Sequence, residues 1–251
     1  KVTWVETDNL YIADDSIRTD TDRIVDGAAQ AAVSATLVNR TGRTAAATVT
    51  VQILDAAGQA VATAARKVEV PAWDAADFAA ELAVPRVKRW RMVRNPYLYT
   101  LTLTVTGEGF SDALTRRIGF RTFAFDADRG FILNGERVQL NGVDLHADLG
   151  PLGMAFDKDA MRRQLEIMAD MGVNALRTSH NPPAPEVLDL CDEMGLFVWD
   201  EGFDKWNNTC GRGDEPLEPF VERNLRRLVR RDRLHPSVFA WSIGNEIAVG
   251  E

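Results

Sequence analysis

The chain has 251 residues, of which 45% are hydrophobic and 26% are charged, the composition of a globular protein with enough apolar residues to build a core. Its formal net charge is -8, which repels phosphate backbones, so we do not expect nucleic-acid binding to be its main role. No apolar run reaches the roughly 20 residues that a membrane-spanning helix needs, so we predict no membrane span. The start at Lys1 carries no leader pattern and leaves a cytoplasmic and a periplasmic or secreted location both open.

Two features that could suggest a ligand site have simpler explanations. Cys191 and Cys210 show neither metal-ligand spacing nor a disulfide framework, and Cys191 continues the apolar stripe of a predicted helix. Six arginines lie within residues 223–233. Because Leu225 and Leu228 recur among them at helical spacing, we predict that the arginines form the solvated face of an amphipathic helix.

Residues 1–123 alternate apolar and polar side chains with a period of two, as half-buried strands do. The alternation is clearest at 48–53 and 99–105. Turn-forming residues separate about seven such runs, which is typical of an antiparallel β-sandwich. This part of the chain has no cysteine, so it lacks the intersheet disulfide of antibody domains.

From residue 124 the pattern changes to alternating strands and helices. Asn134-Gly135 predicts a tight hairpin turn. Four strands are predicted after it, near 143–145, 174–177, 196–199 and 238–243. Asp157 is suited to cap the first intervening helix and Gly195 to end the second. Successive βα units indicate a parallel sheet, doubly wound or barrel, and no glycine-rich phosphate loop follows the first strand, which disfavours dinucleotide binding.

Side chains capable of chemistry gather where each of these strands ends. They are His146 and Asp148 after the first strand, Arg177 and His180 after the second, Asp200 and Glu201 after the third, and Asn245 and Glu246 after the fourth. The carboxyl ends of parallel strands meet at one edge, where barrel enzymes place their active sites. We therefore predict a site at this edge, although Asp200 alone would more simply be a helix cap.

Other conspicuous residues favour structural roles. His235 precedes the fourth strand, so we expect it at the opposite edge of the sheet. Trp199 and Trp241 lie within predicted strands, where packing in the core is the simplest interpretation.

Two segments of the second half resemble signatures of glycoside hydrolase family 2, which includes β-galactosidases, β-glucuronidases and β-mannosidases. Residues 174–182 (NALRTSHNP) look like one signature, and residues 233–246 (RLHPSVFAWSIGNE) look like the other, a long patterned run ending in Asn-Glu. Residues 95–101 also resemble the last strands of the family's middle domain. The resemblance implies a multidomain β plus α/β fold: an immunoglobulin-like β-sandwich over 1–123, then the first four βα units of a TIM (β/α)8 barrel over 124–251.

The resemblance also implies a retaining β-glycosidase that acts by double displacement on a carbohydrate substrate. Glu246 would be the acid/base residue, Asn245 would bond the sugar 2-hydroxyl, and Arg177 would orient the nucleophilic carboxylate. The substrate-binding residues would be His146, Asp148, His180, Asp200, Glu201 and Trp206. In the family the nucleophile lies at the end of the seventh barrel strand, so we expect it outside this chain and expect the 251 residues alone to be inactive. Homo-oligomerisation of the full-length protein stays open.

Within the family, the local sequence favours the β-galactosidase branch. Residues 144–150, 179–186 and 200–206 look most like that branch, although Ala147 stands where many relatives have a second histidine. The loop after Glu201 lacks the acid and the histidine that hold magnesium in some β-galactosidases. We therefore expect no metal and no other cofactor.

Three alternatives stay open. The parent could be a β-glucuronidase or a β-mannosidase of the same family, or a non-catalytic carbohydrate-binding remnant. It could also be a metal-dependent barrel hydrolase with four ligands: His146, His180, Asp200 and Glu246. Such barrels usually carry a His-x-His pair after the first strand, whereas this chain has His146-Ala147-Asp148.

Overall fold

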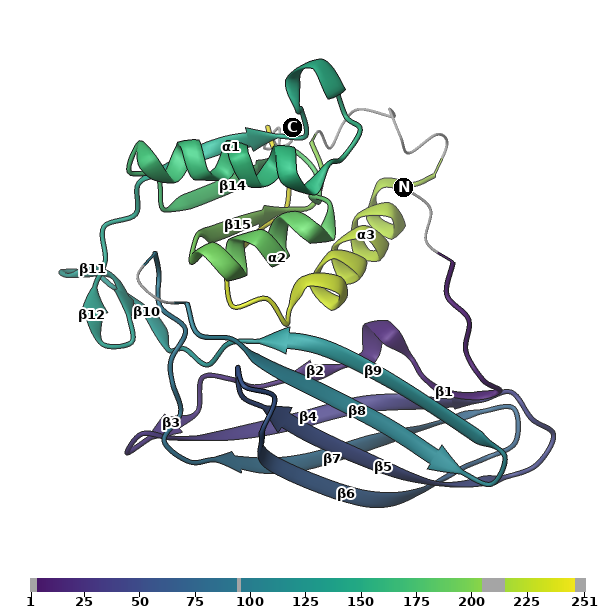
Figure 1. Ribbon diagram of the computed structural model, residues 1–251. Helices are drawn as coiled ribbons and strands as arrows, with labels where there is room; N and C mark the ends of the chain where they lie inside the picture. The colour runs from purple at the N-terminus through teal and green to yellow at the C-terminus, as the bar shows by residue number, and fades with distance from the viewer. Residues whose placement is uncertain (1–3, 94–95, 205–214, 247–251) are drawn as a thin grey trace. The chain divides into compact units, whose positions relative to one another are not determined.

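The computed structural model describes residues 4–93, 96–204 and 215–246, and the chain forms two compact units (Figure 1). The first unit comprises Lys1–Trp90, Tyr97–Ala124 and Ile132–Glu136, and the second comprises Arg91–Pro96, Phe125–Phe131 and Arg137–Glu251. Three short segments thus lie in a different unit from the residues around them in the chain: 91–96 and 125–131 in the second unit, and 132–136 in the first. The domain boundary between residues 123 and 124 stays a prediction.

The first unit contains two antiparallel sheets within the described residues. In one sheet β4 (Ala28–Asn39) is central and pairs with β1 (Leu10–Ile12), β2 (Arg18–Thr19), β3 (Ile24–Val25) and β7 (Ala75–Val84). The other sheet has the order β6 (Ala60–Val70), β5 (Ala45–Leu54), β8 (Tyr99–Gly107) and β9 (Phe110–Ile118). A 3-10 turn, η1 (Asp14–Ser16), follows β1. The predicted β-sandwich is confirmed.

The period-two pattern explains how these strands bury one face. In β5, Val49, Val51 and Ile53 are fully buried, and in β8, Leu101 and Leu103 are fully buried, while the residues between them are partly exposed. Each buried aliphatic side chain contributes about 1.5–3 kcal/mol relative to an exposed one. The alternation predicted from the sequence is therefore the alternation of the sandwich core.

A tight hairpin joins β11 (Gly130–Leu133) to β12 (Glu136–Arg137), and β10 (Phe123–Asp126) pairs with β11. Asn134 and Gly135 have φ values of 53 and 89. A two-residue type I′ turn needs positive φ at both central positions, which Asn and Gly adopt most readily. The predicted Asn-Gly hairpin is confirmed.

The second unit is built on a parallel sheet with its strands in chain order. They are β13 (Gly142–His146), β14 (Ala175–Ser179), β15 (Phe197–Glu201) and β16 (Val238–Ser242). Between them lie η2 (Gly150–Leu152), α1 (Lys158–Asp170), α2 (Pro185–Met194) and α3 (Leu217–Asp232). A doubly wound sheet reverses its strand order at a switch point, whereas a barrel adds each strand beside the preceding one. The order is that of the first four strands of a barrel.

Local sequence signals determine where the helices begin and end. Asp157 caps α1 by accepting a hydrogen bond at Oδ1 from the Ala160 N–H at 2.8 Å. Gly195 follows α2 with φ 72, and a Cβ there would lie 2.4 Å from the Val93 nitrogen. Both helix boundaries predicted from capping residues are confirmed, and Gly195 is required by conformation and by space.

The helices α1 and α2 pack against one face of the sheet through an apolar core (Figure 1). Leu165 of α1 and Leu188 of α2 are fully buried there, with Leu176 and Val198 from the strands. Cys191 is fully buried in the same core, and burial raises the pKa of its thiol well above the ordinary value. Its predicted role as a core residue is confirmed.

Two tryptophans predicted in the core are partly exposed instead. Trp199 is 46% exposed and Trp241 is 38% exposed. Trp199 alternates along β15 with the fully buried Val198 and Asp200, so it lies on the face opposite the helices. Trp241 lies on β16, the edge strand of the described sheet. For both residues the core prediction is wrong.

Buried polar groups join α2 to the segment that precedes β16, at the end of this strand away from the candidate site. Nδ1 of His235 lies 2.6 Å from Oδ2 of Asp192, and the Ser237 N–H donates to Oδ1 of Asp192 at 3.0 Å. Burial opposes the charged form of His235, but the hydrogen bond to Asp192 and the charges of Asp192, Asp232 and Asp189 together raise the histidine pKa. These contacts give His235 a structural role, as predicted.

The side chain of Asp200 is buried on the helix side of the sheet and does not face the site at the strand ends. Asp200 and Asp232 are both fully buried, and Arg231 pairs with Asp232 at 2.6 and 2.7 Å. Burial, followed by the charge of Asp232 and a hydrogen bond to it, raises the pKa of Asp200 to about 8. Asp200 therefore keeps its proton at neutral pH, and Thr178 Oγ1 donates to its Oδ1 at 3.4 Å.

We expect Leu165→Ala to destabilise the protein by about 2–5 kcal/mol, because it leaves a cavity in the helix-side core. Ile167→Ala on the same helix is the matched control, since Ile167 is 45% exposed; its cost should stay within about 1 kcal/mol. Chemical denaturation of each variant measures the difference. Equal losses in the two variants would contradict the packing described.

We expect Asp200→Asn to stabilise the protein by on the order of 2 kcal/mol at pH 7.5. An unfolded aspartate loses its proton near pH 4, whereas folded Asp200 keeps it to about pH 8. Folding therefore becomes less favourable as the pH rises from about 4 to about 8. Asparagine has nearly the same size as aspartate and cannot ionise.

The melting temperature, followed from pH 5 to pH 8, is the measurement. Wild type should lose stability across this range more steeply than Asp200→Asn. Asp170→Asn, at an exposed helix end, should follow the wild-type slope. A variant slope as steep as that of wild type would show that Asp200 is already ionised.

Candidate active site

Parallel pairing brings the carboxyl ends of the four strands to one edge of the sheet. His146 of β13 is in register with Ser179 of β14, and Glu201 of β15 is in register with Ser242 of β16. The polar residues that follow the strands are thereby placed side by side.

The centre of this edge is the carboxylate of Glu201, which is fully buried. Arg177 donates to it twice, from Nε to Oε2 at 3.0 Å and from Nη2 to Oε1 at 3.1 Å. Ser242 Oγ donates to Oε2 at 2.6 Å, and His180 Nδ1 lies 2.7 Å from Oε1. A buried carboxylate is tolerated only when it is paired and hydrogen-bonded, and these contacts satisfy both conditions.

Arg177 extends this network to the loop after β16. Its Nη2 also donates to Oδ1 of Asn245 at 2.9 Å, and its Nη1 lies 3.5 Å from Oδ1 of Asp144. At the other end of the Asn245 amide, Nδ2 donates to Oδ1 of Asp204 at 2.9 Å. One guanidinium therefore joins a carboxylate within β13, a carboxylate at the end of β15 and an amide that follows β16.

Glu246 comes directly after this anchored asparagine and is exposed. Its φ is 47, in the left-handed region that a residue with a Cβ seldom adopts. Such a conformation persists only where the surroundings impose it, and the contacts of Asn245 supply that constraint. The result is an accessible carboxyl group beside a fixed amide, which suits proton transfer to a bound ligand.

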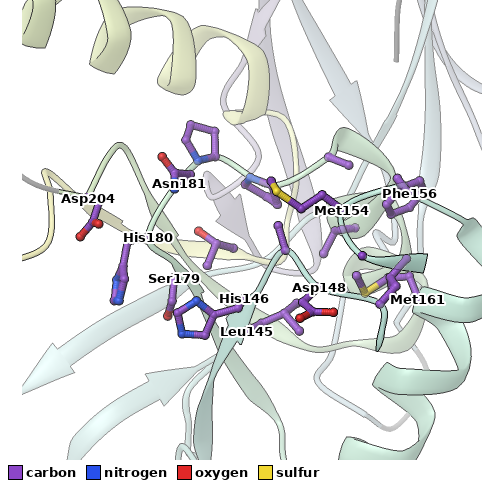
Figure 2. A pocket seen from close by; sticks show the side chains of 18 residues that line it. Leu145, His146, Asp148, Met154, Phe156, Met161, Ser179, His180, Asn181 and Asp204 are labelled. Carbon is purple, nitrogen blue, oxygen red and sulfur yellow. The ribbon is translucent and has the colours of Figure 1, made fainter. Parts of the chain in front are cut away.

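A cavity of about 600 Å³ lies beside this network, at the ends of β13 and β14 (Figure 2). Its polar lining includes the ionisable residues His146, Asp148, His180 and Asp204 together with Thr178, Ser179 and Asn181, and apolar side chains such as Met154 also line it. The rings of His146 and His180 meet edge to face with centroids 5.3 Å apart. Two imidazoles and two carboxylates in an apolar cavity suit a small ligand rich in hydroxyl groups.

Most of the residues predicted from strand ends lie in these two adjoining groups. The network contains Arg177, Glu201 and Asn245, and Glu246 comes directly after Asn245. The cavity is lined by His146, Asp148 and His180. Asp200 is not brought there, because its side chain is buried against α3. Trp206 lies outside the described residues.

Three residues of the network were not singled out from the sequence. Asp144 lies within β13, before the strand end where the candidate residues were sought. Asp204 follows β15 within the loop 200–206, so its place after a strand end was a usable signal. Ser242 ends β16 and meets Glu201 only through the strand register, which the sequence does not reveal.

The four residues considered as metal ligands do not converge. Asp200 is turned toward Asp232 on the helix side, whereas His180 contacts Glu201 at the rim. Among the described residues, no group of three or more His, Cys, Asp or Glu side chains is arranged to hold a metal. No helix in this part of the chain is long and apolar enough to cross a membrane.

Comparison with known proteins agrees with the fold and its polar edge. The profile of glycosyl hydrolases family 2 matches residues 10–121, and the profile of the TIM barrel domain of the same family matches residues 127–251. The β-galactosidase BoGH2A of Bacteroides ovatus is 44% identical over 218 residues, covering 86% of this chain and 26% of that protein. A protein described as a putative β-glucuronidase from Formosa agariphila is 39% identical over 199 residues, covering 78% and 19% respectively.

Among solved structures, a family 2 glycosyl hydrolase from Bacteroides cellulosilyticus superposes with a TM-score of 0.89 at 32% identity, over 97% of this chain and 33% of that one. The chain spans about a fifth to a quarter of the length of the curated relatives it matches. Both of its units match consecutive domains of one family. The chain belongs to glycosyl hydrolase family 2 and comprises its sandwich-like domain and the start of its TIM barrel domain.

Proposed function

We propose that the protein containing this chain is a retaining β-glycosidase that acts on terminal β-galactosides, with Glu246 as its acid/base residue. The observation that carries the proposal is the network in which Glu201 and Arg177 fix Asn245, next to the accessible Glu246. Family membership supports the same reaction, because the named relatives are β-galactosidases and β-glucuronidases.

In a retaining mechanism two carboxyl groups lie about 5 to 5.5 Å apart on the two sides of the scissile bond. Glu246 would give its proton to the glycosidic oxygen while the second carboxylate attacks the anomeric carbon and forms a glycosyl-enzyme. Glu246 would then take a proton from water, which attacks the same carbon and releases the sugar with its configuration retained.

Two acidic residues at the end of β15 are poorly placed to be the second carboxylate. Asp200 and Glu201 are fully buried, and the oxygens of Glu201 already accept from Arg177 and Ser242. The family resemblance implies that the nucleophile lies outside the 251 residues, and the proposal adopts that position.

The remaining groups have distinct parts in the proposal. Arg177 would place a positive charge near the nucleophile and so keep it ionised. Asn245 would hydrogen-bond the sugar 2-hydroxyl, a contact that strengthens in the transition state. His146, Asp148 and His180 line the cavity and would bind further hydroxyl groups.

A neutral sugar fits the described residues better than an anionic one. Arg177 is the cation of the network: its Nε and Nη2 donate to Glu201 and Asn245, and its Nη1 lies 3.5 Å from Oδ1 of Asp144. The described cavity lining contains no lysine or arginine to pair with a uronate carboxylate. A β-glucuronidase is the second candidate, because a relative described as a putative β-glucuronidase is 39% identical.

The substrate is tested with 4-nitrophenyl β-galactoside, β-glucuronide and β-mannoside on the full-length protein. We expect the largest kcat/KM for the galactoside. Faster turnover of the glucuronide would replace the proposed substrate, and no turnover of any of the three would overturn the assignment as a glycosidase.

We expect Glu246→Gln to lower kcat/KM for the 4-nitrophenyl glycoside by about 10²–10⁴-fold, the usual contribution of general acid–base catalysis. The loss should shrink for a dinitrophenyl glycoside, whose leaving group needs less protonation. Added azide should restore turnover by attacking the glycosyl-enzyme without a base. Glu166→Gln, at an exposed site on α1, is the matched control and should behave as wild type.

We expect the 251-residue chain by itself to give no turnover of the galactoside, because the reaction needs a second carboxylate. The full-length protein at the same molar concentration is the positive control. Turnover by the chain that disappears in Glu246→Gln would contradict the prediction and place both carboxyl groups within residues 1–251.

A further inference from the structure

Asp204 occupies a position between the cavity and the network that the proposed mechanism does not yet use. It is partly buried, it lines the cavity near His180, and its carboxylate contacts the amide of Asn245 (Figure 2). We propose that Asp204 is a positioning residue, which sets the direction in which Asn245 presents its amide to the sugar 2-hydroxyl. This inference rests on the proposed function, because it takes Asn245 as the 2-hydroxyl contact.

The loop that carries Asp204 is held against the end of β16 by the backbone. The Gly202 N–H donates to the Ser242 carbonyl at 3.0 Å, and the Asn245 N–H donates to the carbonyls of Phe203 at 3.1 Å and Asp204 at 2.9 Å. Phe203 is buried and packs edge to face on Phe220 with centroids 5.8 Å apart. These contacts fix the position of Asp204 without using its carboxylate.

The Asp204 carboxylate has a separate effect: it fixes the orientation of the Asn245 amide, with the NH₂ group toward Asp204 and the oxygen toward Arg177. Asn245 Nδ2 donates to Oδ1 of Asp204 at 2.9 Å, and Asn245 Oδ1 accepts from Nη2 of Arg177 at 2.9 Å. Rotating the amide by 180° would set its NH₂ group against the guanidinium and its oxygen against the carboxylate. Both contacts would be repulsive, so the opposite charges on the two sides select one orientation.

This orientation leaves a defined capacity for a ligand. The amide nitrogen has two hydrogens, of which Asp204 takes one, and the amide oxygen has two lone pairs, of which Arg177 takes one. One donor and one acceptor site therefore stay directed away from these partners. A hydroxyl group can both accept and donate, so it can use either site.

Loss of the Asp204 carboxylate should leave the loop in place but remove one of the two charges that select the orientation. A hydrogen bond to a charged group is worth about 1.5–3 kcal/mol, a factor of roughly 10 to 100. Asp204→Ala should therefore lower kcat/KM by about 10- to 100-fold. Asp204→Asn, which keeps the size and a possible acceptor but not the charge, should fall between Asp204→Ala and wild type.

The test compares two substrates in the full-length protein: the best 4-nitrophenyl β-glycoside and its 2-deoxy analogue. If Asp204 acts through the 2-hydroxyl, Asp204→Ala should change kcat/KM for the 2-deoxy analogue by less than about threefold, while the parent substrate shows the full loss. Asp170→Ala, at the exposed end of α1, should change neither. Melting temperatures measured in parallel report whether each variant is folded.

Equal losses on the two substrates would overturn the proposal, since Asp204 would then act on something other than the 2-hydroxyl contact. Unchanged kinetics in folded Asp204→Ala and Asp204→Asn would overturn it as well. If Asp204→Ala does not fold, the Asp204→Asn comparison decides between the same outcomes. A wild-type protein that hydrolyses no β-glycoside would instead overturn the proposed function, and this inference with it.

Discussion

The buried carboxylate of Glu201 is the constraint on which the rest of the candidate site depends. Placing a carboxylate where it has no exposure costs several kcal/mol unless donors replace the lost water. Donors from β14, from the loop after it and from β16 supply that replacement through Arg177, His180 and Ser242. The hydrogen bonds to Glu201 therefore hold these three side chains in place, and the site is organised before any ligand binds.

The neighbouring carboxyl group shows how strongly the strand geometry decides chemistry. Asp200 and Glu201 are adjacent in β15, so they point to opposite faces of the sheet. Asp200 meets Asp232 on the helix side, where burial raises its pKa to about 8, and it is neutral at pH 7. Glu201 meets a guanidinium, a hydroxyl and an imidazole instead. Two consecutive acidic residues thus have unrelated roles. Asp200 is a buried, protonated group beside Asp232 of α3, and Glu201 is the acceptor that holds the side chains of the candidate site in place.

Much of this could be predicted from the sequence where the signal is local. Periodicity, the Asp157 cap and the αL position of Gly195 depend on neighbouring residues, and they gave the elements correctly. The gathering of polar residues at one edge followed from the parallel order alone. The side occupied by Asp200 and the exposure of Trp199 depend on which face of β15 the helices cover, and Ser242 depends on the register between β15 and β16. Those are non-local properties, which a single strand pattern does not contain.

The same contacts bear on how a two-carboxylate site can be built from separate parts of a chain. Among the described residues, the hydrogen bonds of Asn245 are made with Arg177, Phe203 and Asp204. The described side-chain contacts of Glu201 also come from the second unit. Within the proposed mechanism, the acid/base half of the site is therefore arranged by the first four βα units themselves. In that mechanism the nucleophile would have to be placed opposite Glu246, whose neighbouring groups are already fixed. In the proposed mechanism Arg177 places a positive charge near the nucleophile, so it couples the two halves of the site energetically.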